Sequence, residues 1–196
     1  HIFNYSQDGF NQTKSFLSQD QIGFYYSHDP SSEFYQTEVN GLKFGFLGFD
    51  LISNPNFNHQ KIIDLISKYN SQVDWLIVSV HWGNEYLPSP ETWRITLAHQ
   101  MVDAGADIIH GHHPHVLQTS EIYQNRPIFY SLGNFIFDQN NFTGNIFHKN
   151  VYSYLIADSI KFNKKGNFIL QIKQAFRIKE LKNIKKIKLI IEKIDN

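Results

Sequence analysis

The sequence predicts an α/β fold with an added antiparallel part, and three observations in its middle carry that prediction. Residues 73–80 form a nearly continuous apolar run, which is typical of a strand buried on both faces. Residues 91–104 have helical spacing, and 106–110 form a second short apolar run. A strand, a helix and a strand in this order predict a parallel pair joined by a crossover helix.

The segments before this unit predict two helices and a hairpin. Residues 10–19 place their apolar side chains on one helical face, and 59–69 have the same spacing. Between them, 34–39 and 42–49 are predicted to be strands, because the Asn-Gly pair that separates them is a strong signal for a tight hairpin turn.

The segments after this unit predict two further hairpins and a basic tail. Apolar residues over 178–194 recur at helical spacing, although a strand over 187–191 fits the same residues. We therefore divide the chain into one domain, residues 1–176, and a basic C-terminal tail, residues 177–196. The two hairpins pair 116–123 with 127–131, and 151–162 with 167–176.

The composition indicates one globular domain and excludes several classes of protein. The chain has 196 residues, of which 41% are hydrophobic and 15% aromatic, enough for a real core. It has no cysteine, which excludes disulfide scaffolds and cysteine-ligated zinc. No signal peptide and no apolar run long enough to span a membrane is visible. Because the first residue is His, we expect a processed start or a piece of a longer protein.

The charge distribution does not favour a nucleic-acid partner. Eighteen basic residues balance eighteen acidic ones, but the part from Lys161 onward holds 11 basic and 3 acidic residues. Lysine runs usually form a solvated face, and the tail has no aromatic side chain beyond Phe176 on which bases could stack. We expect no nucleic acid among the partners.

Histidines carry the chemistry that the sequence predicts. Four of the ten fall within six residues, His110 to His115, where the predicted strand 106–110 ends, and His81 follows the neighbouring strand. Ligands of open α/β sheets bind outside the carboxyl ends of the strands. Pro114 should hold His113 in extended backbone, so that His113 and His115 point to the same side and converge on one ion or one pair of ions. Gly111 is expected to let the backbone bend at the strand end.

Four further histidines are isolated and receive no functional role. We expect them at the surface or on a helix face: His28, His59, His99 and His148.

Three segments in a fixed order make a family resemblance specific. SVHWGNEY, AHQMVDAGADIIHGHHPHVLQ and PIFYSLGNFIFD resemble the CapA family, the poly-gamma-glutamate capsule group of the calcineurin-like metallophosphoesterases. The opening HIFNYSQDGF also resembles a family segment, so that the resemblance covers about residues 1–160. It implies a metallophosphoesterase-like layered β-sandwich flanked by helices (αββα), with N-terminal strands that are missing from this chain.

The resemblance also implies a chemistry and a setting. The chemistry is metal-dependent hydrolysis of a phosphate ester, with two divalent metal ions of the Mn, Fe or Zn type. The setting is the synthesis of a capsule or cell-envelope polymer in a bacterium, in the cell envelope or the cytoplasm. The implied partners are a phosphorylated substrate or an anionic polymer, and membrane proteins of capsule synthesis.

Seven residues receive roles from the resemblance, residue by residue. The implied metal ligands are His81, His113 and His115. His1 would act as general acid or stabilise the transferring phosphoryl group. Glu85, His112 and Asn134 would contact the substrate or support the metal ligands.

The chain also departs from the family pattern. The family's Gly-Asp and Asn-x-Glu motifs, and the Asn directly before His1, are absent, and Asn4 stands where the family has Asp. Asp50, which follows the predicted strand 42–49, and Asp138 are candidates to lie near the site, but neither matches a family ligand position. We therefore expect the C-terminal part of a metallophosphoesterase, inactive alone. The alternative is a non-catalytic scaffold or binding component of a machine that makes or exports an anionic polymer.

Overall fold

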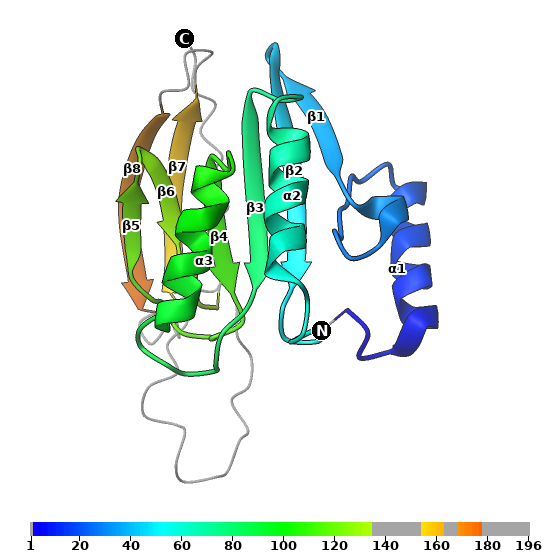
Figure 1. Cartoon of the computed structure of the whole chain (residues 1–196), viewed down its shortest axis with the longest axis horizontal. Coiled ribbons are helices and arrows are strands. Elements are labelled where there is room, and N and C mark those ends of the chain that lie inside the picture. Colours follow the sequence, from blue (N-terminus) through cyan, green and yellow to red (C-terminus); the bar gives the residue numbers. More distant parts are fainter. Residues whose placement is uncertain (1, 135–153, 163–167, 178–196) are drawn as a thin grey trace, which may run out of the picture.

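A six-stranded mixed sheet with helices on one face forms the body of the molecule (Figure 1). The computed structural model describes residues 2–134, 154–162 and 168–177. The strand order in the large sheet is β1-β2-β3-β4-β6-β5, and β7 and β8 form a second, two-stranded sheet. The α/β class with an antiparallel addition is thereby confirmed.

The predicted parallel unit is present at the centre of the large sheet. Strand β3 (Trp75–His81) lies parallel to β4 (Ile108–His112), and helix α3 (Thr92–Asp103) connects them. Strand β2 (Leu42–Asp50) pairs in parallel with the other side of β3. Helix α2 (His59–Asn70) begins after Asn58, whose side chain accepts a hydrogen bond from the backbone N–H two residues later and so caps the helix.

The N-terminal hairpin is also confirmed. Strand β1 (Tyr35–Val39) runs antiparallel to β2. Asn40 and Gly41 have φ values of 53° and 74°, as a tight hairpin turn requires. Helix α1 (Ser6–Gln19) begins four residues earlier than the apolar pattern predicted. A short 3-10 helix, η1 (Pro30–Ser32), was not predicted.

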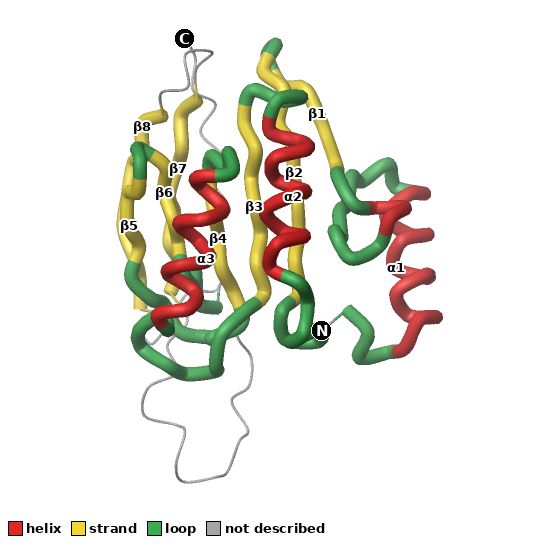
Figure 2. Tube along the Cα trace, in the orientation of Figure 1, coloured by secondary structure: helices red, strands yellow, loops and turns green. Residues whose placement is uncertain are grey.

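The core lies between the large sheet and the two helices that cover one of its faces (Figure 2). Alternate residues of β3 point into this core, as the period of a strand requires, and the side chains from α2 and α3 complete it. The fully buried members of the core include Leu47, Val78, Val80, Trp82, Ile62, Ile66, Met101 and Ile109.

The remaining strands agree with the two predicted C-terminal hairpins. Strands β5 (Ser120–Tyr123) and β6 (Arg126–Phe129) are antiparallel, as are β7 (Tyr154–Phe162) and β8 (Phe168–Arg177). The tail beyond Arg177 lies outside the described residues, so the division into domain and tail stays a prediction. Within the described ranges, no helix is long and apolar enough to cross a membrane.

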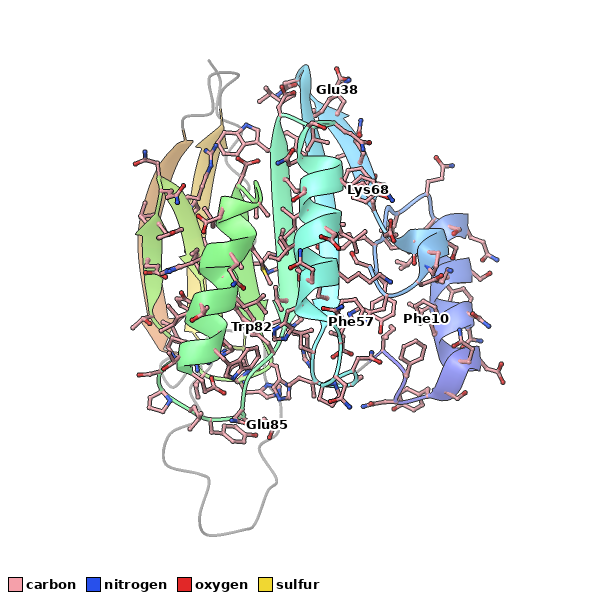
Figure 3. All side chains as sticks on the ribbon, in the orientation of Figure 1. Phe10, Glu38, Phe57, Lys68, Trp82 and Glu85 are labelled. Carbon is pink, nitrogen blue, oxygen red and sulfur yellow. The ribbon has the colours of Figure 1, made fainter. Side chains whose placement is uncertain are left out.

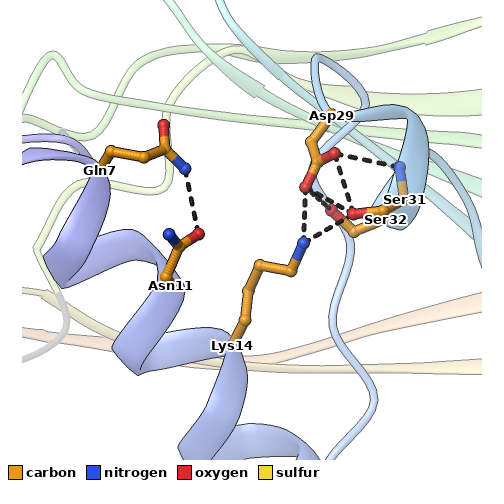
Figure 4. A network of polar contacts seen from close by, with 6 residues as sticks. All are labelled: Gln7, Asn11, Lys14, Asp29, Ser31 and Ser32. Atoms are coloured by element: carbon orange, nitrogen blue, oxygen red, sulfur yellow. Dashed lines mark hydrogen bonds and ion pairs between the residues drawn. The ribbon is translucent and has the colours of Figure 1, made fainter.

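A polar network ties α1 to the segment that precedes the N-terminal hairpin (Figure 4). Lys14 Nζ lies 2.7 Å from Asp29 Oδ2 and 2.7 Å from Ser31 Oγ. The Asp29 carboxylate also accepts hydrogen bonds from the Ser31 N–H and the Ser32 hydroxyl, so it caps η1. The Lys14 ammonium, together with these hydrogen bonds, holds the pKa of Asp29 well below its usual range.

Replacing Asp29 should therefore remove both the cap of η1 and the ion pair with Lys14. We expect Asp29→Ala to lower the free energy of unfolding by about 1–2 kcal/mol, measured by urea denaturation. The loss should shrink below about pH 4, because the carboxylate that stabilises the fold is then being protonated. Asp20→Ala, at the exposed end of α1, is the matched control. An equal loss in both variants would contradict this role.

Candidate metal centre

Three polar side chains stand in one row at the carboxyl end of the parallel strands. Asp50 of β2 is in register with His81 of β3, and His81 is in register with His112 of β4. Residues in register share a face of the sheet, and this row lies on the face opposite the helices. With Tyr25, Tyr26 and Ser79 the row lines a cleft of about 290 Å³.

The two histidines of this row form a close pair. His81 Nδ1 and His112 Nδ1 are 2.7 Å apart, so one imidazole N–H donates to the other ring. Burial lowers the pKa of both imidazoles, and the neighbouring histidine rings lower it further. Both rings are therefore neutral at pH 7, which is the protonation state in which an imidazole binds a metal.

A second group of side chains lies next to this pair and has the composition of a metal site. The ligand atoms of Glu85, His113 and His115 all lie within 4.8 Å of one another. The His113 ring centroid is 4.6 Å from that of His81. Figure 3 shows Glu85 beyond the carboxyl ends of the strands, in the loop that follows β3. We call Glu85, His113 and His115 the His/Glu cluster.

The backbone brings the two cluster histidines together in a way that the sequence did not predict. His113 was expected in extended backbone, but its φ is 102°, and that of His115 is 59°. Both values lie in the left-handed region that residues other than glycine rarely adopt. The two rings face one site, 6.0 Å apart between centroids, because the chain bends at both residues. Such strain at a cluster of polar side chains is typical of functional sites.

Asn134 supports His115 directly. Asn134 Oδ1 lies 2.8 Å from His115 Nδ1, and the Asn134 side-chain amide donates to the His115 carbonyl oxygen. Because the carboxamide oxygen can only accept, the proton of the imidazole stands on Nδ1 and the lone pair stands on Nε2. A hydrogen bond of this kind fixes the ring orientation of a metal ligand. Asn134 thus lies directly against His115, and its supporting role stays a prediction.

Asp50 is a carboxylate that matches no family ligand position in the sequence, yet it lies in the row with His81. Its side chain is buried, and its Oδ1 accepts from the N–H groups of Ile52 and Ser53. Burial opposes its ionisation, but these hydrogen bonds outweigh burial and hold its pKa below the usual value. A buried negative charge thus stands in the same row as His81. The register between β2 and β3 would have revealed it.

The structure places the remaining site residues and histidines as follows. His1 and His148 lie outside the described residues, as does Asp138. His28 was expected at the surface but is half-buried, stacks on Tyr26, and accepts a hydrogen bond from the Asp50 N–H. His99 pairs with Glu121 and His59 stacks on Trp93, both on helices.

The His/Glu cluster fits a divalent transition metal. Two imidazoles and one carboxylate suit Zn, Fe or Mn. Burial lowers the pKa of His113, which keeps that ring neutral. Glu85 was expected to act beside the metal ligands, but its carboxylate lies with the ligand atoms themselves. Among the described residues, His81 and His112 adjoin the cluster rather than belong to it.

Comparison with known proteins places these features in a family. The family described as bacterial capsule synthesis protein PGA_cap matches residues 1–139. The chain is 39% identical to the PGA biosynthesis protein CapA of Bacillus subtilis over 71% of its own length and 41% of that protein. It is 36% identical to the capsule biosynthesis protein CapA of Bacillus anthracis, over 71% of its length and 38% of that protein. The chain thus spans about two fifths of these curated relatives.

Solved structures bear on the fold alone. A hypothetical protein from Thermus thermophilus superposes with a TM-score of 0.59 at 15% identity, over 89% of this chain and 74% of that one. A Staphylococcus aureus protein named as a candidate 5′-nucleotidase superposes with a TM-score of 0.51 at 15% identity, over the whole chain and 38% of that one. These two neighbours confirm the α/β fold of the chain. The family match and the two relatives together show that the chain belongs to the PGA_cap family of bacterial capsule synthesis proteins.

Proposed function

We propose that this protein contributes a metal-dependent phosphoesterase site to the synthesis of a capsule or envelope polymer of the poly-γ-glutamate type. The observation that carries the proposal is the His/Glu cluster, in which two imidazoles and a carboxylate converge at the carboxyl ends of the parallel strands. A phosphorylated substrate or an anionic polymer would bind in the adjoining cleft, where the phosphoryl group would lie beside His81 and His112.

The residues of the site would have separate roles in metal binding and in substrate binding. Glu85, His113 and His115 would hold a divalent ion, and Asn134 would orient the His115 ring. A bound divalent ion supplies Lewis-acid polarisation of a phosphoryl oxygen and lowers the pKa of water. The low dielectric of the half-buried cleft would strengthen hydrogen bonds from the site to the phosphoryl oxygens.

Three finer parts of the proposal rest on the family resemblance. A second divalent ion would use His81, whose ring adjoins His113. His1 would act as general acid or stabilise the transferring phosphoryl group. The protein would work in a bacterial envelope, beside membrane proteins of capsule synthesis.

A scaffold role is the second candidate, and one observation favours it. The Bacillus relatives are named for the process of biosynthesis rather than for a reaction. Family and fold do not by themselves establish an activity. In this reading the cleft would bind the anionic polymer or another component of the machine, and no bond would be broken.

Metal removal separates the two candidates. The protein expressed from its complete gene is assayed on a chromogenic phosphate monoester and diester with Mn²⁺, Fe²⁺ or Zn²⁺, and again after chelation. We expect turnover with at least one metal and a loss of about 10³-fold on chelation, because metal polarisation contributes several kcal/mol. Re-addition of the metal should restore the rate. Polymer binding without turnover under all conditions would contradict the enzyme and support the scaffold.

A further inference from the structure

A buried arginine stands behind the loop that carries Glu85. Arg94 lies in the first turn of α3, and its side chain is 0% exposed. Its guanidinium stacks near the Trp82 ring, with 5.6 Å from Cζ to the ring centroid. A buried guanidinium is costly unless neighbouring groups neutralise and hydrogen-bond it. The groups that surround Arg94 must therefore compensate the cost of burying its charge.

The partners of Arg94 belong to the two segments that carry the His/Glu cluster. Arg94 Nη2 lies 2.5 Å from Glu91 Oε2 and donates to Gln118 Oε1 at 2.9 Å. Glu91 lies in the same loop as Glu85, and Gln118 lies three residues after His115. One side chain thus joins both segments.

Glu91 and Gln118, the two partners of Arg94, each also form hydrogen bonds with the loop that carries Glu85. Glu91 Oε1 accepts from the backbone N–H of Asn84 at 3.2 Å and from its side-chain amide at 3.1 Å. Gln118 Nε2 donates to the Leu87 carbonyl oxygen at 2.8 Å. The two contacts bracket Glu85, one directly before it and one two residues after it. The loop is therefore held at two points, with Glu85 between them.

The loop backbone also contacts the other cluster segment and Arg94 itself. The Tyr86 N–H donates to the Pro114 carbonyl oxygen at 2.8 Å, between the two cluster histidines in sequence. A Cβ on Gly83 would stand 2.6 Å from Arg94 Cζ, so the loop packs directly on the guanidinium. Gly83 has a φ of 82°, which favours glycine for a second reason.

We propose that Arg94 is a positioning residue for metal binding: through Glu91 and Gln118 it holds Glu85 at the distance from His113 and His115 that a divalent ion requires. This inference rests on the metal site proposed above and deepens it. Arg94 does not touch the ligands. It fixes the loop, and without it Glu85, which is exposed, would lose its place. We expect lysine to replace it poorly, because both contacts come from one guanidinium nitrogen, Nη2, and an ammonium is a compact charge on a flexible stem rather than part of a rigid planar group.

The test is a Co²⁺ titration of the protein expressed from its complete gene, followed by visible absorption. Arg94→Lys should weaken Co²⁺ binding by about tenfold or more, the range for residues that orient metal ligands. Its bound spectrum should shift toward that of Glu85→Gln, because both variants lose the same carboxylate from the site. A merely structural role for Arg94 would lower stability without this spectral change.

Arg126→Lys is the matched control. Arg126 also pairs with a carboxylate, Asp107, and lies 5.5 Å from a tryptophan ring, but at the other end of the sheet. We expect it to lose stability and keep the Co²⁺ affinity and spectrum of the unchanged protein. If Arg94→Lys does not fold, Gln118→Ala removes one arm of the contact and should shift the spectrum in the same direction.

The outcomes separate this inference from the proposed function. If the unchanged protein binds Co²⁺, Glu85→Gln weakens the binding, and both Arg94→Lys and Gln118→Ala bind like the unchanged protein, then the positioning role is overturned while the metal site stands. If the unchanged protein does not bind Co²⁺, both are overturned.

Discussion

Replacing His113 should abolish metal binding and turnover together. In the protein expressed from its complete gene, we expect His113→Ala to weaken divalent metal binding and to reduce metal-dependent turnover by more than about 100-fold. The expected loss exceeds the 10- to 100-fold range for residues that only orient a ligand, because one of three cluster ligands is removed outright. Isothermal titration with Mn²⁺ or Zn²⁺ and a phosphoesterase assay measure the two effects.

The backbone at His113 allows a sharper version of this experiment. Its φ of 102° is strained for alanine as well as for histidine, whereas glycine adopts it at no steric cost. His113→Gly should therefore lose the metal as His113→Ala does, yet unfold at a higher urea concentration. If metal binding is lost in both variants while stability differs, the loss follows the imidazole and not the fold.

The matched control is a histidine outside the site. His99 is half-buried, stacks on Tyr123 and pairs with Glu121 at 2.8 Å. His99→Ala should lose some stability and keep metal affinity and turnover. If His113→Gly kept normal affinity and turnover, His113 would not be a ligand, and the His/Glu cluster would not be the metal centre.

The sheet could be predicted from the sequence because its signals are local and redundant. The run 73–80 is apolar on both faces, and the next apolar run follows one helix later. A parallel pair with a crossover is the arrangement that buries both. Parallel pairing then fixes which strand ends meet, and this is why His81 and His112 lie close together, as the sequence led us to expect.

The local geometry of the site could not be predicted, because it depends on contacts between distant segments. Pro114 disfavours a helical conformation at His113 but does not determine the sign of its φ. The row that includes Asp50 depends on the register between β2 and β3, which a single sequence does not give. Arg94 looks like an ordinary polar residue of an amphipathic helix until its two distant partners are seen.

Gly111 is another residue whose structural role differs from the one that the sequence predicted. We expected it to supply a bend at the strand end, but it lies inside β4 and is absent from the residues with positive φ. Glycine is required at this position because the neighbouring atoms leave no room for a side chain. A Cβ at this position would stand 2.2 Å from the Tyr130 carbonyl oxygen and 2.4 Å from Trp82 Nε1. Those two atoms are joined by a hydrogen bond of 3.0 Å that runs past Gly111.

Gly111→Ala should therefore be among the most destabilising single-methyl changes in the chain. The added carbon must separate the indole from the carbonyl oxygen or displace β4 against β6, and both neighbours are buried. We expect a loss of about 3–4 kcal/mol in the free energy of unfolding, from overpacking and from the broken hydrogen bond. Urea denaturation followed by tryptophan fluorescence measures it.

The same change should also affect the metal site, because Gly111 stands directly before His112 and two residues before His113. Metal affinity should fall even at low temperature, where the variant is still folded. The control is Gly9→Ala in helix α1, where the added carbon would stand 2.7 Å from the Cβ of Tyr5, an exposed residue that can move aside. That variant should change stability by no more than about 1 kcal/mol and leave metal binding intact. A Gly111→Ala protein as stable as Gly9→Ala would mean that β4 and Tyr130 are less closely packed than the structure places them.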